Sequence, residues 1–269
     1  MNPIFRTVLS LWIWTAVIIL LVVWYPLLVI IRLTDRDPVR YRTGRWFRRL
    51  GMAMVKVNPF WRVEFSGEYP ANPRLPYVVV SNHQSLADIP IISHLPWEMK
   101  WVAKRVLFDL PLVGWMMRLA GDLPLDRSDR QSGARMIIAA KRCLEGRCSV
   151  MIFPEGTRSL DGRVSRFTDG AFQLAKRAGV PILPLAVDGS LNCLPKHSWM
   201  YGKPETIRVK ILPPILTSDA RTPSELRDVV RSQIIAQIAE WRGCASAEVD
   251  AMGRAETPGS SGEGKRNEE

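Results

Sequence analysis

A stretch of 24 residues from Val8 to Ile31 contains no charged side chain and is rich in leucine, isoleucine, valine and tryptophan. About 20 apolar residues in a helix cross the hydrocarbon core of a bilayer, so this stretch is long enough to span a membrane with some tilt. A buried helix of a water-soluble domain rarely continues for this length without a polar face. We therefore predict that residues 1–31 form a transmembrane anchor.

Two more interpretations of this stretch stay open. A re-entrant hairpin could turn near Pro26, and a cleaved signal peptide would need a shorter apolar part and a clear cleavage site. The flanking charges predict the orientation: Arg6 alone precedes the stretch, whereas seven arginines follow it between Arg32 and Arg49. Because basic residues collect on the cytoplasmic side, we expect the rest of the chain in the cytoplasm, at a bacterial inner membrane.

Residues 32–57 are strongly basic, and we predict that they form an amphipathic segment at the membrane interface. Between Arg32 and Arg62, nine basic residues against two aspartates supply +7 of the net charge of +11. Such a strip is attracted to anionic lipid headgroups by about 1 kcal/mol per basic residue. A helix packed on the folded domain is the alternative. No zinc-finger, RNA-binding or basic-zipper pattern accompanies the charge, so we expect no nucleic-acid partner.

Residues 58–242 alternate between short apolar runs and helical patterns, which predicts an α/β domain with a mainly parallel sheet and flanking helices. Small and charged residues dominate 243–269, which predicts a disordered tail. The strand candidates are Arg62–Ser66, Tyr77–Ser81, Lys100–Ala103, Ser149–Phe153, Ile182–Val187 and Ile207–Leu212. The helix candidates are Leu86–His94, Leu112–Ala120, Ser132–Glu145, Gly170–Ala178 and Pro223–Trp241.

The segment Ser81–Asp88 follows a predicted buried strand and contains a candidate base. His83 would lie at the carboxyl end of that strand, where open α/β sheets place their sites. A neutral imidazole can take a proton from a hydroxyl group, and Asp88 could fix the tautomer of the ring. Alternatively Asp88 only caps the next helix, since Ser-x-x-Asp is also a capping-box pattern. The other two histidines, which we interpret as structural, are His94 and His197.

A second segment, Phe153-Pro154-Glu155-Gly156-Thr157-Arg158-Ser159, follows another predicted buried strand and suits a phosphorylated substrate. Gly156 allows a tight turn and a close approach of the backbone to a ligand. Arg158 offers forked donors to phosphate oxygens, while Glu155 could accept from a substrate hydroxyl or hold an arginine. The alternative is a turn with a surface Glu–Arg pair, which contributes about 0–1 kcal/mol.

Two further segments fit the same site. Gly121–Arg127 ends in a second arginine, and two convergent arginines neutralise a phosphate dianion better than one does. An exposed loop arginine is the alternative for Arg127. The run Val180-Pro181-Ile182-Leu183-Pro184 indicates a core strand, with a second role as a wall of an acyl groove left open.

In this order and spacing, the four segments resemble the four sequence blocks of the glycerolipid acyltransferase family, of the 1-acyl-sn-glycerol-3-phosphate acyltransferase type. The resemblance covers about residues 58–214, and the third block is specific because it matches without change. The matched positions are Asn82-His83 to Asp88, Asp126-Arg127, Phe153 to Ser159, and Val180 to Pro184.

The resemblance implies His83 as a general base with Asp88 as its orienting partner. It implies a lysophospholipid acceptor, 1-acyl-sn-glycerol-3-phosphate, whose free hydroxyl receives an acyl chain from acyl-CoA or acyl-carrier protein to give phosphatidic acid in phospholipid biosynthesis. No cofactor, metal or covalent acyl-enzyme is implied. The implied phosphate and glycerol site consists of Arg127, Glu155, Gly156, Thr157 and Arg158.

One departure from the family pattern concerns the acceptor. Members that act on lysophosphatidic acid often carry Phe-Lys-x-Gly after the third block, where this chain has Phe167-Thr168-Asp169-Gly170. Loss of the lysine and gain of Asp169 should weaken a dianion site unless Arg163 or Arg166 compensates. Remodelling of another lysophospholipid therefore stays open. A lipid-binding module without turnover and a hydrolase also stay open, although no Gly-x-Ser-x-Gly elbow supplies a serine nucleophile.

Overall fold

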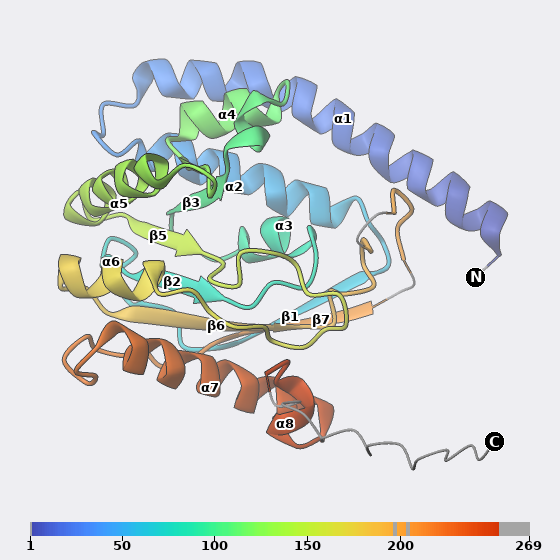
Figure 1. Cartoon of the computed structure of the whole chain (residues 1–269). Coiled ribbons are helices and arrows are strands. Elements are labelled where there is room, and N and C mark those ends of the chain that lie inside the picture. Colours follow the sequence, from blue (N-terminus) through green and yellow to red (C-terminus); the bar gives the residue numbers. More distant parts are fainter. Residues whose placement is uncertain (1, 196–197, 203–204, 253–269) are drawn as a thin grey trace, which may run out of the picture.

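The computed structural model describes residues 2–195, 198–202 and 205–252. Within them, a seven-stranded sheet of order β1-β7-β6-β2-β5-β3-β4 forms the centre of the molecule (Figure 1). Strands β6, β2, β5, β3 and β4 run parallel, whereas β7 is antiparallel to β6 and pairs in parallel with β1. The predicted α/β fold is thus confirmed. The strands are β1 (Trp61–Gly67), β2 (Val78–Ser81), β3 (Met99–Lys104), β4 (Leu123–Leu125), β5 (Ser149–Ile152), β6 (Ile182–Asp188) and β7 (Glu205–Ile211).

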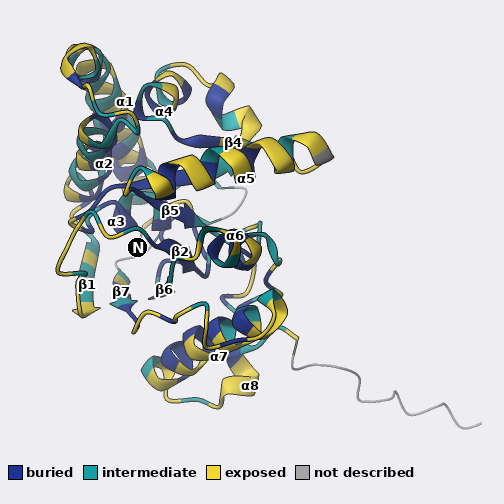
Figure 2. Cartoon of the chain, turned by 90° about the vertical axis from the view of Figure 1, so that its left-hand side faces the viewer, coloured by how far each residue is buried: buried dark blue, intermediate teal, exposed yellow. Residues whose placement is uncertain are grey.

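Helices cover both faces of the sheet. Helices α5, α6 and α7 pack on one face, and α2 and α3 pack on the other, with α1 and α4 outside α2 (Figure 1). Buried residues follow the strands and the inner sides of these helices, while much of α1 is exposed (Figure 2). The helices are α1 (Pro3–Thr34), α2 (Tyr41–Lys56), α3 (Asp88–Ile92), the 3-10 helix η1 (Arg105–Asp109), α4 (Val113–Ala120), α5 (Arg130–Glu145), α6 (Gly170–Ala178), α7 (Pro223–Arg242) and α8 (Ser246–Val249).

Strand β2 lies in the middle of the sheet and ends at the candidate site. Its valines are fully buried on both sides, as is typical of a parallel strand covered by two helix layers. Val78 and Val80 face the α5–α6–α7 layer, and Val79 faces α3. Beyond the strand, the Asn82 side chain donates to the carbonyl of Val187 and accepts from its N–H, at 2.8 and 2.9 Å. Asn82 therefore ties the following turn to β6.

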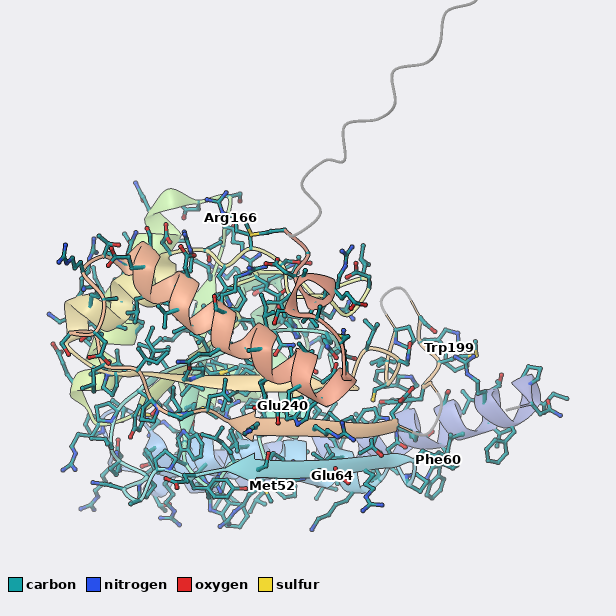
Figure 3. The ribbon with its side chains drawn as sticks, turned by 90° about the horizontal axis from the view of Figure 1, so that it is seen from below. Met52, Phe60, Glu64, Arg166, Trp199 and Glu240 are labelled. Carbon is teal, nitrogen blue, oxygen red and sulfur yellow. The ribbon has the colours of Figure 1, made fainter. Side chains whose placement is uncertain are left out.

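Helix α1 is continuous through Pro26, so the hairpin interpretation of this stretch is wrong. It is long and apolar enough to cross a membrane, and it packs on the domain along its length. Ile13 in its first half packs against Tyr201, and Leu28 in its second half packs between α2 and α4. Trp199 lies beside α1, with its carbonyl accepting from the Trp14 indole at 2.7 Å (Figure 3). The predicted apolar helix is confirmed, and spanning stays a prediction.

Helix α2 forms within the segment that we expected at the membrane interface. It packs between α1, α3, α4 and β3, so the alternative of a helix packed on the domain describes its contacts. A side chain at Gly51 would place its Cβ 2.9 Å from that of Ser93, so this glycine lets α2 approach α3 closely. Contact of the exposed basic residues of α2 with lipid headgroups stays a prediction.

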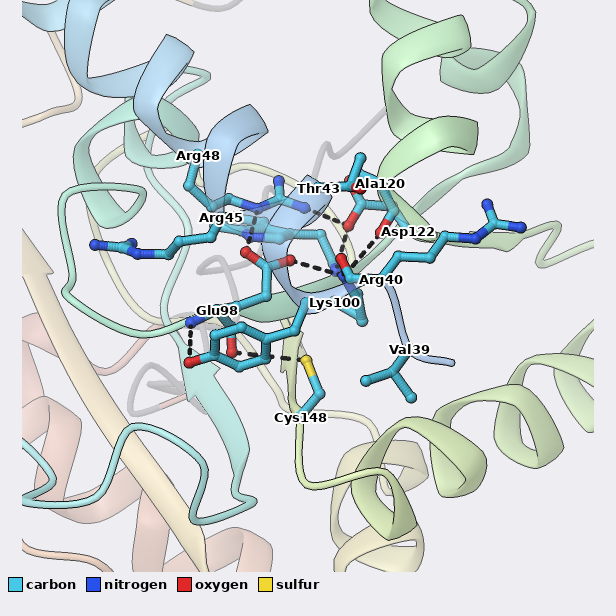
Figure 4. Close-up of polar contacts among 12 residues, drawn as sticks. Val39, Arg40, Thr43, Arg45, Arg48, Glu98, Lys100, Ala120, Asp122 and Cys148 are labelled. Atoms are coloured by element: carbon cyan, nitrogen blue, oxygen red, sulfur yellow. Dashed lines mark hydrogen bonds and ion pairs between the residues drawn. The ribbon is translucent and has the colours of Figure 1, made fainter. Parts of the chain in front are cut away.

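A buried charge cluster joins α2 to the sheet (Figure 4). The Nε atom of Arg48 lies 3.6 Å from Glu98, and its Nη2 atom pairs with Asp122. The ammonium group of Lys100 donates to Glu98 at 3.0 Å and to two backbone carbonyl groups. Two positive and two negative charges therefore compensate one another in the interior, which removes most of the cost of burying each alone.

The environment of this cluster differs from that of a surface ion pair. Burial raises the pKa of Glu98. Burial alone would lower the pKa of Lys100, but the field of Glu98 and nearby carboxylates outweighs it and raises that pKa. A Cβ at Gly44 would lie 1.9 Å from a Glu98 oxygen, so a glycine is required where α2 crosses the cluster. Its members lie up to 74 positions apart, and no sequence pattern predicted them.

The C-terminal part of the structure differs from the expected tail. Helix α7 begins with the predicted capping box of Thr222 and Glu225. After Gly243, the chain forms the short helix α8, whose Val249 is buried, and Asp250 pairs with Arg231 of α7. The prediction of disorder is therefore wrong for residues 243–252. The rest of the predicted tail, 253–269, lies outside the described residues.

Candidate active site

His83 and Asp88 lie together at the carboxyl end of β2. The Nδ1 atom of His83 is 2.7 Å from Oδ2 of Asp88, and the histidine side chain is 12 % exposed. Because an ionised carboxylate only accepts, this contact places the ring proton on Nδ1. The Nε2 atom makes no hydrogen bond with any described residue and is left as the basic nitrogen. The ring stacks on Phe153 with centroids 4.0 Å apart.

Asp88 orients the histidine and also holds the turn that precedes α3. Its Oδ2 atom accepts from the backbone N–H groups of Gln84 and Ser85, at 2.8 and 2.9 Å. Its Oδ1 atom accepts from the hydroxyl of Ser190, which follows β6. The orienting contact of Asp88 is therefore present in the geometry, whereas α3 begins without a side-chain cap, so the capping alternative is not observed. A carboxylate with four donors is held in one position, which in turn fixes the ring of His83.

Ser190 is a site residue that the motifs did not reveal. It is fully buried, and its hydroxyl lies between Asp88 and the side-chain oxygen of Gln84. Gln84 in turn donates to Asp188 at 3.0 Å. The signal was available in the sequence, since Asp188-Gly189-Ser190 follows an apolar strand that neighbours β2 in the sheet.

Glu155 joins the two main motifs through their backbones. One of its oxygens accepts from the N–H of His83 at 2.7 Å, and the other accepts from the N–H of Ser165 at 2.9 Å. The N–H of Ser159 donates to the carbonyl of His83 at 2.8 Å, so a second hydrogen bond joins the same segments. Burial raises the pKa of Glu155. Neither oxygen pairs with an arginine of the described part of the chain, contrary to one of our expectations, and the geometry gives Glu155 a positioning role.

Gly156 and Arg127 form the next part of the site. Gly156 has a φ of +74°, and its carbonyl accepts a hydrogen bond from the Arg127 guanidinium. A Cβ at Gly156 would lie 2.4 Å from that guanidinium, so both the conformation and the space require glycine. Partial burial lowers the pKa of Arg127. Its remaining N–H groups make no hydrogen bond with described residues.

The other two predicted residues of this loop have side chains without partners among the residues that the structure describes. Thr157 is exposed and Arg158 is half-buried, and neither side chain bonds or pairs with a described residue. A cavity of about 400 Å3 beside the loop is lined by Arg127, Gly156 and Phe153 but not by Arg158. The structure thus brings Arg127 to the cavity next to the His83 stack, whereas convergence of Arg158 on the same cavity is not observed.

The departure at Thr168 and Asp169 changes the site less than the sequence suggested. The Thr168 hydroxyl donates to the Pro154 carbonyl at 2.9 Å, and the residue lines the cavity. Asp169 pairs instead with Arg227 of α7 at 2.7 Å and does not line the cavity. Arg163 is paired with Asp161, so it offers no free charge in place of the lysine. Arg166 is exposed at the surface (Figure 3).

An apolar groove of about 320 Å3 opens between α1, α2, α3 and the segment from η1 to α4. Trp101 and Ala103 of β3 line it, and the Trp101 ring lies 5.8 Å from the Phe153 ring that stacks on His83. The groove therefore reaches the catalytic candidates through two aromatic side chains. Its apolar lining includes Trp14, Leu21, Phe47, Met54, Leu86 and Met117.

The remaining candidates have structural positions. The run from Val180 to Pro184 leads into β6, which is core and lines neither the groove nor the cavity, so the suggested wall of an acyl groove is not found there. The Nδ1 atom of His94 lies 3.1 Å from the carbonyl oxygen of Pro90, and its ring faces that of Phe65. His197 lies outside the described residues.

Comparison with known proteins gives consistent matches. A family model described as "Acyltransferase" matches residues 62–188. A chloroplast 1-acyl-sn-glycerol-3-phosphate acyltransferase of Arabidopsis thaliana is 33 % identical over 230 residues, which cover 84 % of this chain and 60 % of the relative. The human 1-acyl-sn-glycerol-3-phosphate acyltransferase alpha is 35 % identical over 195 residues, which cover 70 % and 67 %. The chain thus spans less than two thirds of the plant relative.

A solved structure resembles this chain over almost its whole described length. The crystal structure of the 1-acyl-sn-glycerophosphate acyltransferase of Thermotoga maritima has a TM-score of 0.78 and 26 % sequence identity to it. The match covers 91 % of this chain and 99 % of that one. The similarity therefore extends beyond the residues that the family model matches.

Proposed function

Because the chain belongs to the acyltransferase family, we propose that it acylates the free hydroxyl of 1-acyl-sn-glycerol-3-phosphate, which gives phosphatidic acid. The resemblance of its four sequence blocks to glycerolipid acyltransferases is confirmed by the family match. The plant, human and Thermotoga relatives carry the name of this activity. The acyl donor is acyl-CoA or acyl-carrier protein, since both present the same thioester.

The observation that carries this proposal is the state of the His83 ring. Asp88 holds Nδ1 at 2.7 Å, and Nε2 is the one ring nitrogen that can accept a proton. A hydroxyl group is a weak nucleophile near neutral pH and needs such a base at the moment of attack. Phe153, which stacks on His83, lines the cavity beside Arg127, and its ring lies 5.8 Å from that of Trp101, which lines the apolar groove.

The reaction follows from these positions. Nε2 of His83 takes the proton from the acceptor hydroxyl as its oxygen attacks the thioester carbonyl carbon. Asp88 stabilises the imidazolium that forms. The tetrahedral intermediate then collapses, the carbon–sulfur bond breaks, and the thiolate leaves and takes the proton from the imidazolium. The new ester is the product, and His83 returns to its neutral form.

The substrate groups are assigned by chemistry. The acceptor phosphate binds at Arg127, whose forked guanidinium is already positioned by the Gly156 carbonyl. We propose Arg158, on the same loop as Gly156, as a second positive charge for this phosphate, although it does not line the cavity. Since Asp169 is neutralised by Arg227, its charge does not argue against a phosphate dianion. The donor's acyl chain lies in the apolar groove, where burial of methylene groups contributes about 0.8 kcal/mol each.

The membrane supplies the acceptor and receives the product. Helix α1 associates the chain with the bilayer, and the arginines after it favour a catalytic domain on the cytoplasmic face of a bacterial inner membrane. In that position, a water-soluble donor reaches the site from one side and a lysophospholipid reaches it from the other.

The test is acyl transfer by purified His83→Ala protein, measured as thiol release from acyl-CoA with lysophosphatidic acid. We expect turnover to fall by at least about a thousandfold, because both the base and its orientation are lost. The matched control is His94→Ala, which should keep the activity. Near-normal transfer by His83→Ala would end the proposal. A panel of lysophospholipid acceptors with the wild-type chain then identifies the preferred headgroup.

A further inference from the structure

An exposed apolar surface lies on the segment from η1 to α4, outside the site described above. The inner side of the same segment, including Leu107 and Met117, lines the apolar groove. We call residues 105–120 the groove lip, because they separate the groove from the surroundings. The large apolar side chains exposed on its outer side are Val106 (63 %), Leu110 (45 %) and Trp115 (46 %).

The outer side of the groove lip continues the exposed face of α1. The rings of Trp115 and Tyr25 have centroids 5.4 Å apart, and α4 lies beside α1 in the fold (Figure 1). Val22 and Ile18 share the helix face of Tyr25, and both are more than half exposed. One apolar surface therefore extends from the membrane helix onto the groove lip.

The charges at the edge of this surface also match a lipid bilayer. Lys104 and Arg105 stand exposed where the groove lip begins, and the exposed carboxylate of Asp109 within it is paired with Arg118 at 2.9 Å. Val106 lines a cavity together with Arg127, which is the proposed phosphate ligand. Basic residues bordering an apolar face are typical of elements that lie at the interface of anionic membranes.

A strained turn shapes the tip of the groove lip. Leu112 has a φ of 59° and a ψ of −63°, and the N–H of Val113 donates to the carbonyl of Pro111 at 2.7 Å. This three-residue turn is rare for residues other than glycine. It leaves Leu110 and Pro111 exposed at the tip. Strained backbone of this kind persists mainly where function requires it.

We propose that the groove lip is a second membrane-contacting element, whose outer apolar residues lie at the headgroup–acyl boundary of the bilayer that holds α1. The occupant of this surface is lipid. A lysophospholipid passes along the lip, with its phosphate reaching Arg127 while its acyl chain is still in the membrane. The inference rests on the proposed function for the identity of the acceptor, and it adds the route by which that acceptor arrives.

The depth of the groove lip tests the inference directly. The full chain carries Cys244→Ser, which leaves only buried native thiols, and a single added cysteine with an environment-sensitive dye. The test position is Leu110→Cys and the matched control is Val229→Cys, equally exposed but on α7 across the sheet. In vesicles of phosphatidylcholine and phosphatidylglycerol, the dye at 110 should shift to the blue and be quenched by lipids with a nitroxide near the headgroup. Water-like emission at both positions would overturn the inference.

Turnover on two forms of the acceptor gives the functional test. Leu110→Asp should lower transfer to lysophosphatidic acid in vesicles about tenfold, because the lip no longer enters the interface. Transfer to a short-chain lysophosphatidic acid dissolved as monomers should not change, and the control Ile138→Asp on α5 should affect neither rate. Equal loss on both acceptors would overturn the inference. Absence of turnover by the wild-type chain would instead refute the proposed function, while the dye at 110 still decides the position of the lip.

Discussion

Two clusters of ionisable residues in this molecule use the same chemistry for different ends. In the buried charge cluster, Arg48 lies between Glu98 and Asp122, and its side chain is only 4 % exposed. In the candidate active site, Asp88 is just as buried, but its partner His83 keeps one ring nitrogen open. The charges of the first cluster pair with one another, although Arg48 and Asp122 also border the apolar groove, whereas the second cluster leaves one ring nitrogen without a partner among the described residues.

The difference shows what distinguishes a structural cluster from a reactive one. A buried ion pair that loses one partner leaves an uncompensated charge, so its replacement destabilises the fold. The Nε2 atom of His83 contributes little to the free energy of unfolding. Its loss should lower turnover instead. Substitutions in the two clusters should therefore change different measurements, namely the unfolding equilibrium for one and turnover for the other.

The largest effect on stability is expected for Asp122→Ala. The substitution removes the carboxylate that pairs with Arg48. It also removes the acceptor of the backbone N–H of Trp101, which donates to Asp122 at 3.0 Å. We expect the free energy of unfolding to fall by about 3–5 kcal/mol, seen as a lower melting temperature in detergent. The control Arg48→Met/Asp122→Leu removes both charges and should recover most of the loss. Equal stability of the single and double variants would contradict a compensated cluster.

A smaller effect, on turnover alone, is expected for Ser190→Ala. Without the hydroxyl, one oxygen of Asp88 loses its donor and the His83 ring is less well oriented. We expect kcat to fall about tenfold to a hundredfold at an unchanged KM, with a displaced pH profile. The control is Ser85→Ala, a buried serine whose hydroxyl bonds to the Leu194 carbonyl rather than to Asp88. Unchanged kcat in Ser190→Ala would remove Ser190 from the site.

Arginine substitutions sharpen the comparison further. Arg127→Ala should raise the KM for lysophosphatidic acid about tenfold, since a charge-assisted contact to phosphate is lost, and should leave the melting temperature unchanged. The control Arg135→Ala removes an exposed arginine paired with Asp129 at 2.7 Å and should change neither quantity. A destabilised Arg127→Ala protein with normal KM would place Arg127 with the structural cluster.

The smallest effect concerns His94, a histidine closed in by the fold. Burial lowers its pKa below the ordinary value that it regains on unfolding. Between these two pKa values, the unfolded chain therefore binds more protons than the folded chain. The contribution of His94 to the free energy of unfolding is complete above about pH 6.5 and is lost as the pH falls through the folded pKa. His94→Gln should flatten this decline in melting temperature between pH 7 and pH 5. An unchanged slope would show that other groups cause it.

Much of the fold could be predicted because local patterns agreed with the packing. Each predicted strand and helix of the α/β domain is present with its ends within two residues, since buried parallel strands read as apolar runs and helices as periodic ones. The reversed direction of β1 and β7 was not predicted, because strand direction depends on contacts between distant segments. The order in 243–252 was missed for the same reason, since Val249 and Asp250 are held by tertiary contacts.

The candidate site was likewise predicted only in part from the sequence. The motifs placed His83, Asp88, Arg127 and Gly156 together, because each follows a strand that ends at the same edge of the sheet. The role of Glu155 was not predicted, since its contacts are to backbone groups that a sequence does not display. Ser190 was missed because it lies 102 positions from Asp88, outside every recognised block.

The central claim is that the Asp88 carboxylate makes His83 an effective base, and Asp88→Asn tests it most directly. The amide oxygen can take the place of Oδ2, which accepts from Nδ1 of His83 and from the backbone N–H groups of Gln84 and Ser85, so the turn before α3 is kept. The neutral amide carries no negative charge, so it cannot stabilise the imidazolium that forms when His83 takes the proton. We predict that kcat for lysophosphatidic acid falls about 10³- to 10⁴-fold at an unchanged melting temperature. A kcat close to the wild-type value would contradict the account, because Asp88 would then only hold the turn before α3.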